Sequence, residues 1–437
     1  MSNVFGGEEV NALVLDIGTC LVKAGYAGDD VPKAVFPSAA GVIAAGKENG
    51  AGASVWPSGR KLYVGQSGVN YRRDNMEVTS PYNLSNNQPS SDGFADWEIV
   101  EAILDHAFRD RLSTDLSEYA LMMAEPNAMP KRAREQAAEL LFEKHKPPAL
   151  FLAKNAVLST FAHAKQSALV VDAGHHEITA TAVHDGYLLS KTLAKSPIGG
   201  HLLNLAMQKA VECKGIQFKP RFSFKRFENP QGKLEVQDVP VAATTSFRNY
   251  QVEALAGDVR EALCRVSDLP FDEAASANVP TVAYELPDGT EISIGPDRFK
   301  VPELTFNPSL LPTFPLLTAD LIPRRPDGSL PSSITDLVSE SLLKCDVDLR
   351  KELAQGVLLT GGLSLTPGMR DRLEKELAER HQALKFKVLM PANPLERRFS
   401  TWIGGSILAS LGSFQQLWMS RKEYEEHGAS LIHRKCP

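Results

Sequence analysis

The sequence lacks the features that mark secreted, membrane-spanning and nucleic-acid-binding proteins. It has five cysteines among 437 residues and no Cys-x-x-Cys pair, so neither a disulfide framework nor a zinc site of familiar spacing is expected. No apolar run reaches the ~18 residues that a membrane-spanning helix needs, and residues 1–10 lack the basic and apolar regions of a signal peptide. The net charge of −6 excludes the basic excess typical of nucleic-acid binders. We therefore expect a protein of the cytosol or nucleus, whose mildly acidic balance permits basic partners such as histones.

The chain is long enough for two lobes, each with its own core. Single hydrophobic cores stop growing beyond roughly 250–300 residues, whereas this chain has 437. Hydrophobic residues make up 43% and charged residues 23%, which is the balance of an ordinary globular protein. Composition therefore predicts at least two folded lobes.

The strongest internal signal is a near-repeat of two segments far apart in the chain. Residues 12–18 (ALVLDIG) and 168–174 (ALVVDAG) share an apolar run, an aspartate and a glycine. Each continues into a second β-like stretch, residues 20–25 and 178–183, so each predicts a β-hairpin. The separation is too long for a solenoid repeat. It indicates a duplicated α/β domain whose two halves face each other.

Helical and β patterns alternate along the rest of the chain, which favours α/β lobes. Helices are predicted over residues 96–112, 130–142 (with Pro130 in the first turn), 246–266 and 332–355. Strands are predicted over residues 119–124, 149–153, 357–360 and 386–390, with a hairpin tip at 286–290. Loops or insertions are predicted over residues 39–59, 214–246 and 302–331.

The two Asp-x-Gly turns together predict a site for phosphate and metal. Glycine in a tight turn lets backbone N–H groups approach an anion, and Asp16 and Asp172 can hold water molecules around Mg²⁺. Lys23 can reach a phosphate. A third apolar run ends at Thr360-Gly361-Gly362, where backbone could approach a flat ligand such as adenosine, although a plain strand-to-helix turn explains it equally well. No Walker A sequence is present, which argues against a P-loop enzyme.

Several motifs resemble the actin family across nearly the whole chain. Residues 16–30 (DIGTCLVKAGYAGDD) are similar to the first phosphate loop of actin, and residues 32–38 (PKAVFPS) continue it. Residues 284–289 (YELPDG) match an actin hairpin, while 402–411 and 433–436 resemble the actin C-terminus. The resemblance implies an α/β, actin-like ATPase fold with two lobes of duplicated α/β domains, four subdomains, and Mg²⁺ with ATP or ADP in a central nucleotide cleft.

The resemblance also assigns subdomains and site residues. Subdomain 1 would comprise residues 1–37, 79–161 and 400–437; subdomain 2, residues 38–78; subdomain 3, residues 162–198 and 314–399; and subdomain 4, residues 199–313. The implied nucleotide contacts are Gly18, Thr19, Cys20, Leu21, Lys23, Asp172, Gly174, Gly200, Arg260, Glu261, Gly361, Gly362 and Arg398. Asp16 and Asp172 would hold Mg²⁺ through water.

Departures from the actin pattern predict very slow or absent hydrolysis. Cys20 replaces a glycine beside the phosphates, and residues 173–176 (AGHH) lack the hydroxyl and the acidic side chain of actin's second loop. Asn155 stands where actin has the glutamine that positions water, and Thr179 where it has a nearby histidine. The resemblance therefore implies a bound nucleotide without a catalytic residue.

Three smaller features have simple explanations. His175 and His176 are adjacent, so on an extended chain they point to opposite faces and are not expected to share one metal ion. Cys20 is expected to be a small buried residue rather than a reactive thiol. The basic residues of 131–134 (KRAR) are expected to form an exposed helix face rather than a localisation signal.

The surfaces used by filament-forming actin have diverged. Residues 39–59 form a Gly/Ala-rich stretch, and residues 309–317 (SLLPTFPLL) depart from the segment that plugs between filament strands, so no self-filament is expected. An apolar groove between the lobes is retained at Phe161, Leu408, Leu411, Ser413 and Leu417. The alternative is that these leucines belong to the core of the last helices.

These features resemble the nuclear class of actin-related proteins. That class implies a nuclear, structural subunit of chromatin-remodelling and histone acetyltransferase complexes. Its partners would be monomeric actin and a long helix of a scaffold subunit, with histones or the nucleosome as further candidates and no membrane. The alternatives are a filament-forming cytoskeletal actin-like ATPase and a phosphoryl-transfer enzyme such as a sugar kinase, for which no catalytic base stands out.

Overall fold

The fold is described here from a computed structural model. The structure describes residues 11–46, 55–83, 90–231 and 234–437. The expectations for residues 1–10 and for residues 47–54 of the Gly/Ala-rich stretch lie outside this range. Within the described part of the chain, every helix is too short or too polar to cross a membrane.

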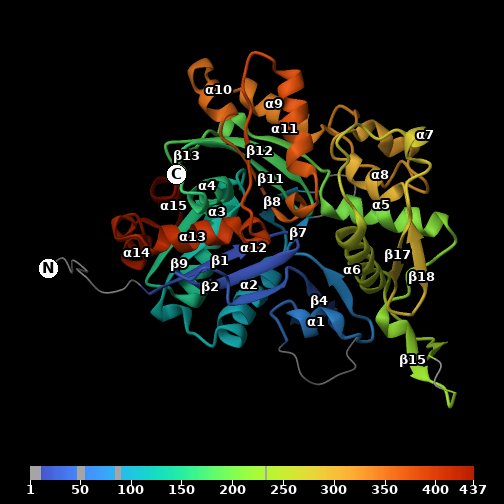
Figure 1. The fold of residues 1–437 in the computed structure, drawn as a ribbon. Coiled ribbons are helices and arrows are strands. Elements are labelled where there is room, and N and C mark those ends of the chain that lie inside the picture. The colour runs from blue at the N-terminus through green and yellow to red at the C-terminus, as the bar shows by residue number, and fades with distance from the viewer. Residues whose placement is uncertain (1–10, 47–54, 84–89, 232–233) are drawn as a thin grey trace.

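Two main sheets repeat one arrangement of strands (Figure 1). In spatial order, the first contains β21 (Met419–Ser420), β10 (Ala149–Lys154), β9 (Ala120–Glu125), β1 (Ala12–Ile17), β2 (Leu21–Tyr26) and β3 (Ala34–Pro37). The second contains β13 (Tyr187–Leu188), β12 (Ile178–His184), β11 (Ala168–Ala173), β19 (Val357–Thr360) and β20 (Val388–Leu389), with β14 (Ala194–Ser196) also on β12. In each, a central strand pairs antiparallel with the strand after it and parallel with a later one. The duplicated α/β domain predicted from the near-repeat is thereby confirmed.

Helices pack around both sheets and build two large cores. They are α1 (Gln66–Asn70), α2 (Trp97–Asp105), α3 (Lys131–Leu140), α4 (Asn155–Ala162), α5 (Gly200–Cys213), α6 (Thr245–Leu263), α7 (Glu273–Ser276), α8 (Asp297–Glu303), α9 (Ile334–Leu343), α10 (Val347–Ala354), α11 (Met369–Arg380), α12 (Pro394–Arg398), α13 (Ser400–Ser410), α14 (Arg421–His427) and α15 (Ile432–Lys435). One core contains residues of the first sheet and of α13, and the other contains residues of the second sheet, α5 and α6. The four-subdomain boundaries given above remain a prediction.

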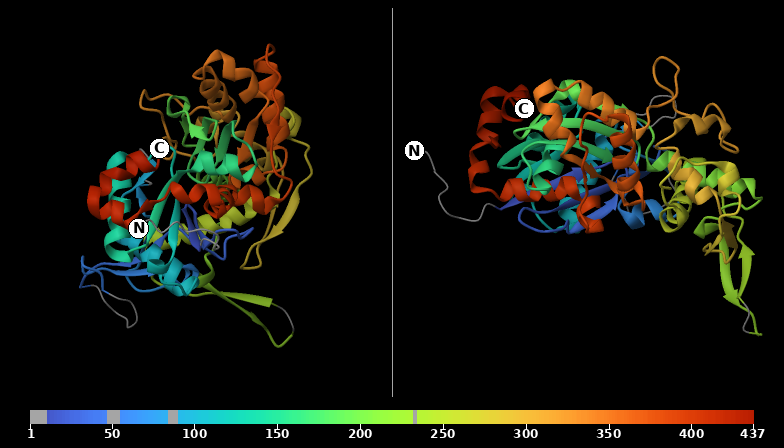
Figure 2. Two further views of the ribbon diagram at one scale, coloured as in Figure 1. Left: turned by 90° about the vertical axis from the view of Figure 1, so that its left-hand side faces the viewer. Right: turned by 45° about the horizontal axis from the view of Figure 1, so that its top comes forward.

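The described residues also form four small sheets. They are β5 (Lys61–Val64) with β4 (Ala40–Ile43) and β6 (Glu77–Thr79), β7 (Tyr82–Asn83) with β8 (Ser90–Phe94), β15 (Phe224–Glu228) with β16 (Leu234–Asp238), and β17 (Val282–Glu285) with β18 (Glu291–Ile294). Of these, the hairpin β15–β16 protrudes from the molecule (Figure 1 and Figure 2). The predicted hairpin tip lies between β17 and β18, where Gly289 has a φ of 87°. The sheet of β4, β5 and β6 contacts the start of α6. There Val78 N–H donates to Ser246 Oγ at 2.9 Å, and Met76 and Phe247 are buried in one cluster.

Several predicted elements need correction. The single helix predicted over 332–355 is two helices, because the chain leaves helical geometry at Asp346, the N-cap of α10. The loop predicted over 214–246 contains the hairpin β15–β16, since alternating Phe and basic residues there form a strand. The loop predicted over 39–59 contains strand β4. Pro130 is the N-cap of α3 rather than its first residue. The strand predicted over 386–390 is reduced to β20.

The basic stretch at the start of α3 is only partly an exposed face. Lys131 and Arg132 are exposed, but Arg134 is buried. Its Nε donates to Glu125 Oε2 at 3.0 Å, so burial of this guanidinium is compensated by an ion pair. The expectation of an exposed face is therefore wrong for Arg134.

Helices α4 and α13 cross closely between the two sheets (Figure 1). Leu158 of α4 belongs to the first core, while Ala156 of the same helix packs with strands of the second sheet. Gly404 lies at the crossing: a Cβ atom built there would lie 1.8 Å from the carbonyl oxygen of Leu158. The two backbones can approach this closely only because position 404 carries no side chain.

We expect Gly404→Ala to destabilise the protein by at least about 1–3 kcal/mol, because the methyl group must push the two helices apart. Gly412→Ala is the matched control, since a Cβ atom at that position meets nothing within 4 Å. Urea unfolding of both variants measures the difference. Equal midpoints for Gly404→Ala and wild type would contradict the packing described here.

Candidate functional site

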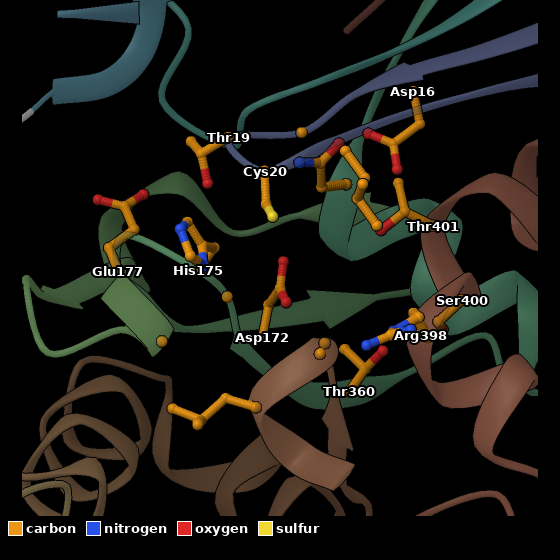
Figure 3. A pocket seen from close by; sticks show the side chains of 18 of the residues that line it. Asp16, Thr19, Cys20, Asp172, His175, Glu177, Thr360, Arg398, Ser400 and Thr401 are labelled. Carbon is orange, nitrogen blue, oxygen red and sulfur yellow. The ribbon is translucent and has the colours of Figure 1, made fainter. Parts of the chain in front are cut away.

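A cavity opens at the carboxyl ends of strands β1, β9, β11 and β19, between the two main sheets (Figure 3). Its lining includes every residue that the resemblance assigned to nucleotide contact: Gly18, Thr19, Cys20, Leu21, Lys23, Asp172, Gly174, Gly200, Arg260, Glu261, Gly361, Gly362 and Arg398. Asp16, Asn155 and Thr179 line it as well. The carboxyl end of a parallel sheet is where α/β proteins commonly bind ligands.

The two aspartates hold matching positions in the two hairpins. Asp16 lies opposite Lys23 in the ladder of β1 and β2, and Lys23 Nζ donates to Asp16 Oδ2 at 2.8 Å. Asp172 lies opposite Thr179 in the ladder of β11 and β12, so no ammonium stands at the equivalent place. Burial raises the pKa of the Asp172 carboxyl to about 6; the Lys23 ammonium opposes this rise and the charge of Asp16 adds to it. Two carboxylates beside one ammonium favour an additional cation.

Gly18, Gly174 and Gly361 allow close approach within and between the turns, whereas Gly362 borders open space. Gly18 N–H donates to Leu21 O, and Gly174 N–H donates to Glu177 O, both at 3.0 Å. Each turn is therefore closed by a hydrogen bond from the glycine N–H to the carbonyl oxygen three residues later. A Cβ atom at Gly361, where φ is 91°, would lie 2.4 Å from Ala173 O. At Gly362 a Cβ atom would meet nothing within 4 Å, so this position borders open space of the cavity.

Three helices begin at the cavity. Asn155 is the first residue of α4, Gly200 of α5 and Ser400 of α13, and all three residues line it. A helix N-terminus carries unpaired backbone N–H groups and a partial positive charge, which suits an anion such as phosphate. Asn155 Oδ1 is buried and has no hydrogen-bond partner among the described residues, so it remains available to a ligand or water.

Two arginines and one glutamate of the cavity lining are linked by ion pairs. Arg260 Nε donates to Asn204 Oδ1 at 2.7 Å, and its Nη2 lies 3.1 Å from Glu261 Oε1. Arg398 Nη2 lies 3.3 Å from the other oxygen of Glu261. These pairs join α6 to the end of α12 and restrain the polar side chains of the cavity lining.

Cys20 differs from the expectation of a buried residue. Its side chain is exposed, because it faces the open cavity. The protein around the cavity still withdraws the sulfur from bulk water, which raises the pKa of the thiol to about 11, and the charge of Glu253 adds to the effect. At neutral pH the group is therefore a thiol, which agrees with the expectation that it is not a reactive thiolate.

Some lining residues were not found from the sequence. The hydroxyl of Tyr82 donates to Ile17 O, and burial raises its pKa, so it supports the first turn as a neutral phenol. Asn127 Oδ1 accepts a hydrogen bond from Ala156 N at 3.0 Å and holds the start of α4. Asn127 follows strand β9, and its position after a predicted strand was the one available signal.

The predicted partner groove is partly exposed and partly core. Leu408 is 8% exposed and belongs to the first core, so the core interpretation is correct for this residue. Leu411 is 40% and Leu417 50% exposed, and Ser413 is exposed as well. Phe161 is half-buried. An exposed apolar surface therefore exists at Leu411 and Leu417.

Comparison with known proteins agrees with this architecture. The family model described as Actin matches residues 7–437. A protein named actin-related protein 4 from Oryza sativa subsp. indica is 49% identical over 457 residues, covering 99% of this chain and 100% of that protein. The Arabidopsis thaliana protein of the same name is 46% identical over 461 residues, with 99% and 100% coverage. A Schizosaccharomyces pombe protein named SWI/SNF and RSC complexes subunit arp42 is 30% identical over 452 residues, with 98% and 100% coverage. The chain therefore belongs to the actin family, and it is similar along its whole length to proteins named actin-related protein 4.

Proposed function

We propose that this protein binds Mg²⁺ with ATP or ADP and acts as a nuclear, non-polymerising structural subunit of chromatin-remodelling and histone acetyltransferase complexes. The observation that carries the nucleotide part is the pair of Asp-x-Gly turns, which line one cavity together with the first residues of three helices. The similarity to proteins named actin-related protein 4 and to a subunit of the SWI/SNF and RSC complexes supports the chromatin part.

Different residues of the cavity would contact the phosphates, the metal, and the sugar and base of the nucleotide. The turns at Gly18 and Gly174, with Lys23, would hold the phosphates, and Asp16 and Asp172 would hold Mg²⁺ through water. The bound metal supplies positive charge that neutralises the phosphates. The remaining contacts would surround the sugar and base: Gly200, Arg260, Glu261, Gly361, Gly362 and Arg398.

Asp172→Asn should lower the affinity for Mg²⁺-nucleotide by about 10–100-fold, because the metal's water shell loses a charged partner. Asp30→Asn is the control, since Asp30 is exposed and does not line the cavity. Fluorescent ATP titration with and without EDTA measures the effect. Nucleotide-free purified protein that gains no thermal stability from Mg²⁺ and ATP would contradict the assignment.

In this proposal the nucleotide is a structural ligand that the protein does not hydrolyse at a useful rate. Positioned groups that activate water contribute typically about 10²–10⁴-fold to a rate. Asn155 is shorter than glutamine, and Thr179 carries a hydroxyl instead of an imidazole. Both side chains line the cavity, which supports the proposal that these changes affect the positioning of water.

Single-turnover phosphate release should therefore be very slow, and Asn155→Gln combined with Thr179→His should raise it. Each single variant is the control for the pair. A wild-type rate equal to that of polymerised actin, measured side by side, would refute the proposal of a structural nucleotide.

For the partner surface, we propose that Leu411 and Leu417 receive an apolar helix face of a scaffold subunit, next to monomeric actin. Exposed apolar patches mark interaction sites, and an amphipathic helix suits a groove of this kind. Histones or the nucleosome are further proposed contacts of the assembled complex.

Leu417→Asp should reduce recovery of scaffold and actin from nuclear extract at least tenfold, because a carboxylate would be buried against an apolar helix. Leu343→Asp is the matched control, since Leu343 is 59% exposed at the end of α9. Circular dichroism should show both variants folded. Full recovery of partners by Leu417→Asp would exclude this surface.

Sedimentation with Mg²⁺ and ATP should leave the wild type in the supernatant, and filament pelleting would instead favour the cytoskeletal alternative.

A further inference from the structure

Two histidines and a glutamate meet beside the cavity, at the junction of three elements. His175 lies in the turn between β11 and β12, His201 in the first turn of α5, and Glu253 on α6. His175 Nε2 lies 3.2 Å from Glu253 Oε1, and His201 Nδ1 lies 2.6 Å from the same oxygen. Each residue offers one ligand atom, and these atoms all lie within 4.8 Å of one another.

Backbone contacts hold the two histidines together. His201 N–H donates to His175 O at 2.6 Å, and Gly200 N–H donates to Gly174 O at 3.1 Å. The approach depends on Gly199, because a Cβ atom there would lie 2.4 Å from His175 O. The start of α5 is thereby fixed against the turn, and α5 packs on α6, which carries Glu253. The cluster is therefore assembled by the fold rather than by mobile side chains alone.

The adjacent histidine supports the cluster from one side. The ring of His176 stacks on the ring of His201, with centroids 4.7 Å apart and an interplanar angle of 9°. Its Nδ1 is buried and has no hydrogen-bond partner among the described residues. Stacking restricts the plane of the His201 ring, and the unpaired nitrogen indicates that protein groups alone do not complete the hydrogen bonding here.

The donor set selects the metal. Two imidazole nitrogens and one carboxylate oxygen are the three protein ligands of zinc sites that keep a fourth position for water. Mg²⁺ prefers oxygen ligands, so the cluster is chemically distinct from the Asp16 and Asp172 pair. Zinc ligands at about 2.0–2.2 Å from the ion lie roughly 3.3 Å from one another. The two distances to Glu253 Oε1, 2.6 and 3.2 Å, lie somewhat below this value, and all three ligand atoms lie within 4.8 Å of one another, so the group is close to the size of a zinc site.

We propose that His175, His201 and Glu253 bind one Zn²⁺ ion. From the sequence alone, the adjacent residues His175 and His176 are not expected to share one ion. The structure instead joins His175 to two residues from other elements, and His176 lies outside the group of ligand atoms. Since His175 lines the cavity, the ion would sit in its wall with the fourth position held by water (Figure 3).

The test uses the full-length protein after removal of metals with a chelator. Calorimetric titration with ZnCl₂ should show one ion per chain with micromolar or tighter affinity. His201→Gln and Glu253→Gln should each weaken binding at least tenfold. His427→Gln is the matched control, because His427 lies on α14 with a side chain 46% exposed and outside the cluster. Titration with Co²⁺ should give the visible absorption of a four-coordinate site in wild type and lose it in both variants.

Two results would overturn the proposal. Zinc binding that is equal in wild type, His201→Gln and Glu253→Gln would place the ion elsewhere. Absence of binding by folded wild-type protein at 100-fold excess ZnCl₂ would leave the cluster as a hydrogen-bonded ion pair of His201 with Glu253. If His201→Gln fails to fold by circular dichroism, His175→Gln replaces it and must meet the same tenfold criterion.

Discussion

Helices α4 and α13 cross so closely that their contact joins the packing of the two main sheets. Gly404 allows one helix backbone to rest on the carbonyl of Leu158, and α4 contributes side chains to the cores on both sides. The crossing therefore fixes the distance between the two main sheets. Because both helices begin at the cavity, it also fixes where their N-termini point. Packing between helices thus sets the electrostatics of the site.

The charges of the cavity follow from the duplicated hairpins. Both hairpins place an aspartate at the same ladder position, but only the first places a lysine opposite it. The second has Thr179 there, so Asp172 lacks a direct ammonium partner, and burial raises the pKa of its carboxyl. The asymmetry leaves negative charge on the side that the metal would occupy, and positive charge at the helix starts where phosphates would lie.

The sequence predicted the features that depend on local patterns. The apolar runs ending in Asp-x-Gly specified both hairpins, because strand period and turn residues lie within one short segment. The residues that the resemblance assigned to the nucleotide all line one cavity, and their contact with a nucleotide stays a prediction. The exposure of Cys20 and the burial of Arg134 were missed, because Cys20 faces a cavity built by distant segments and Arg134 also donates to the carbonyl oxygen of Cys436 near the C-terminus.

The cluster of His175, His201 and Glu253 illustrates the limit of sequence reasoning. Its members are spread over three elements, and only the packing of α5 on α6 brings Glu253 to the histidines. Spacing along the chain contains no signature of such a group. The adjacent His176 lies in the same turn as His175, but its ring stacks on His201 and it contributes no ligand atom to the group.

The contact between the small sheet of β4, β5 and β6 and the start of α6 bears on how fast the molecule can exchange a ligand. Thr244 Oγ1 donates to Met76 O at 2.5 Å, and the Met76 and Phe247 side chains are each 1% exposed. Separating these elements would return both side chains to water at a cost of about 1.5–3 kcal/mol each. Opening of the lobes on this side is therefore an activated step. A ligand enclosed between them has a residence time set by that opening as well as by its own contacts.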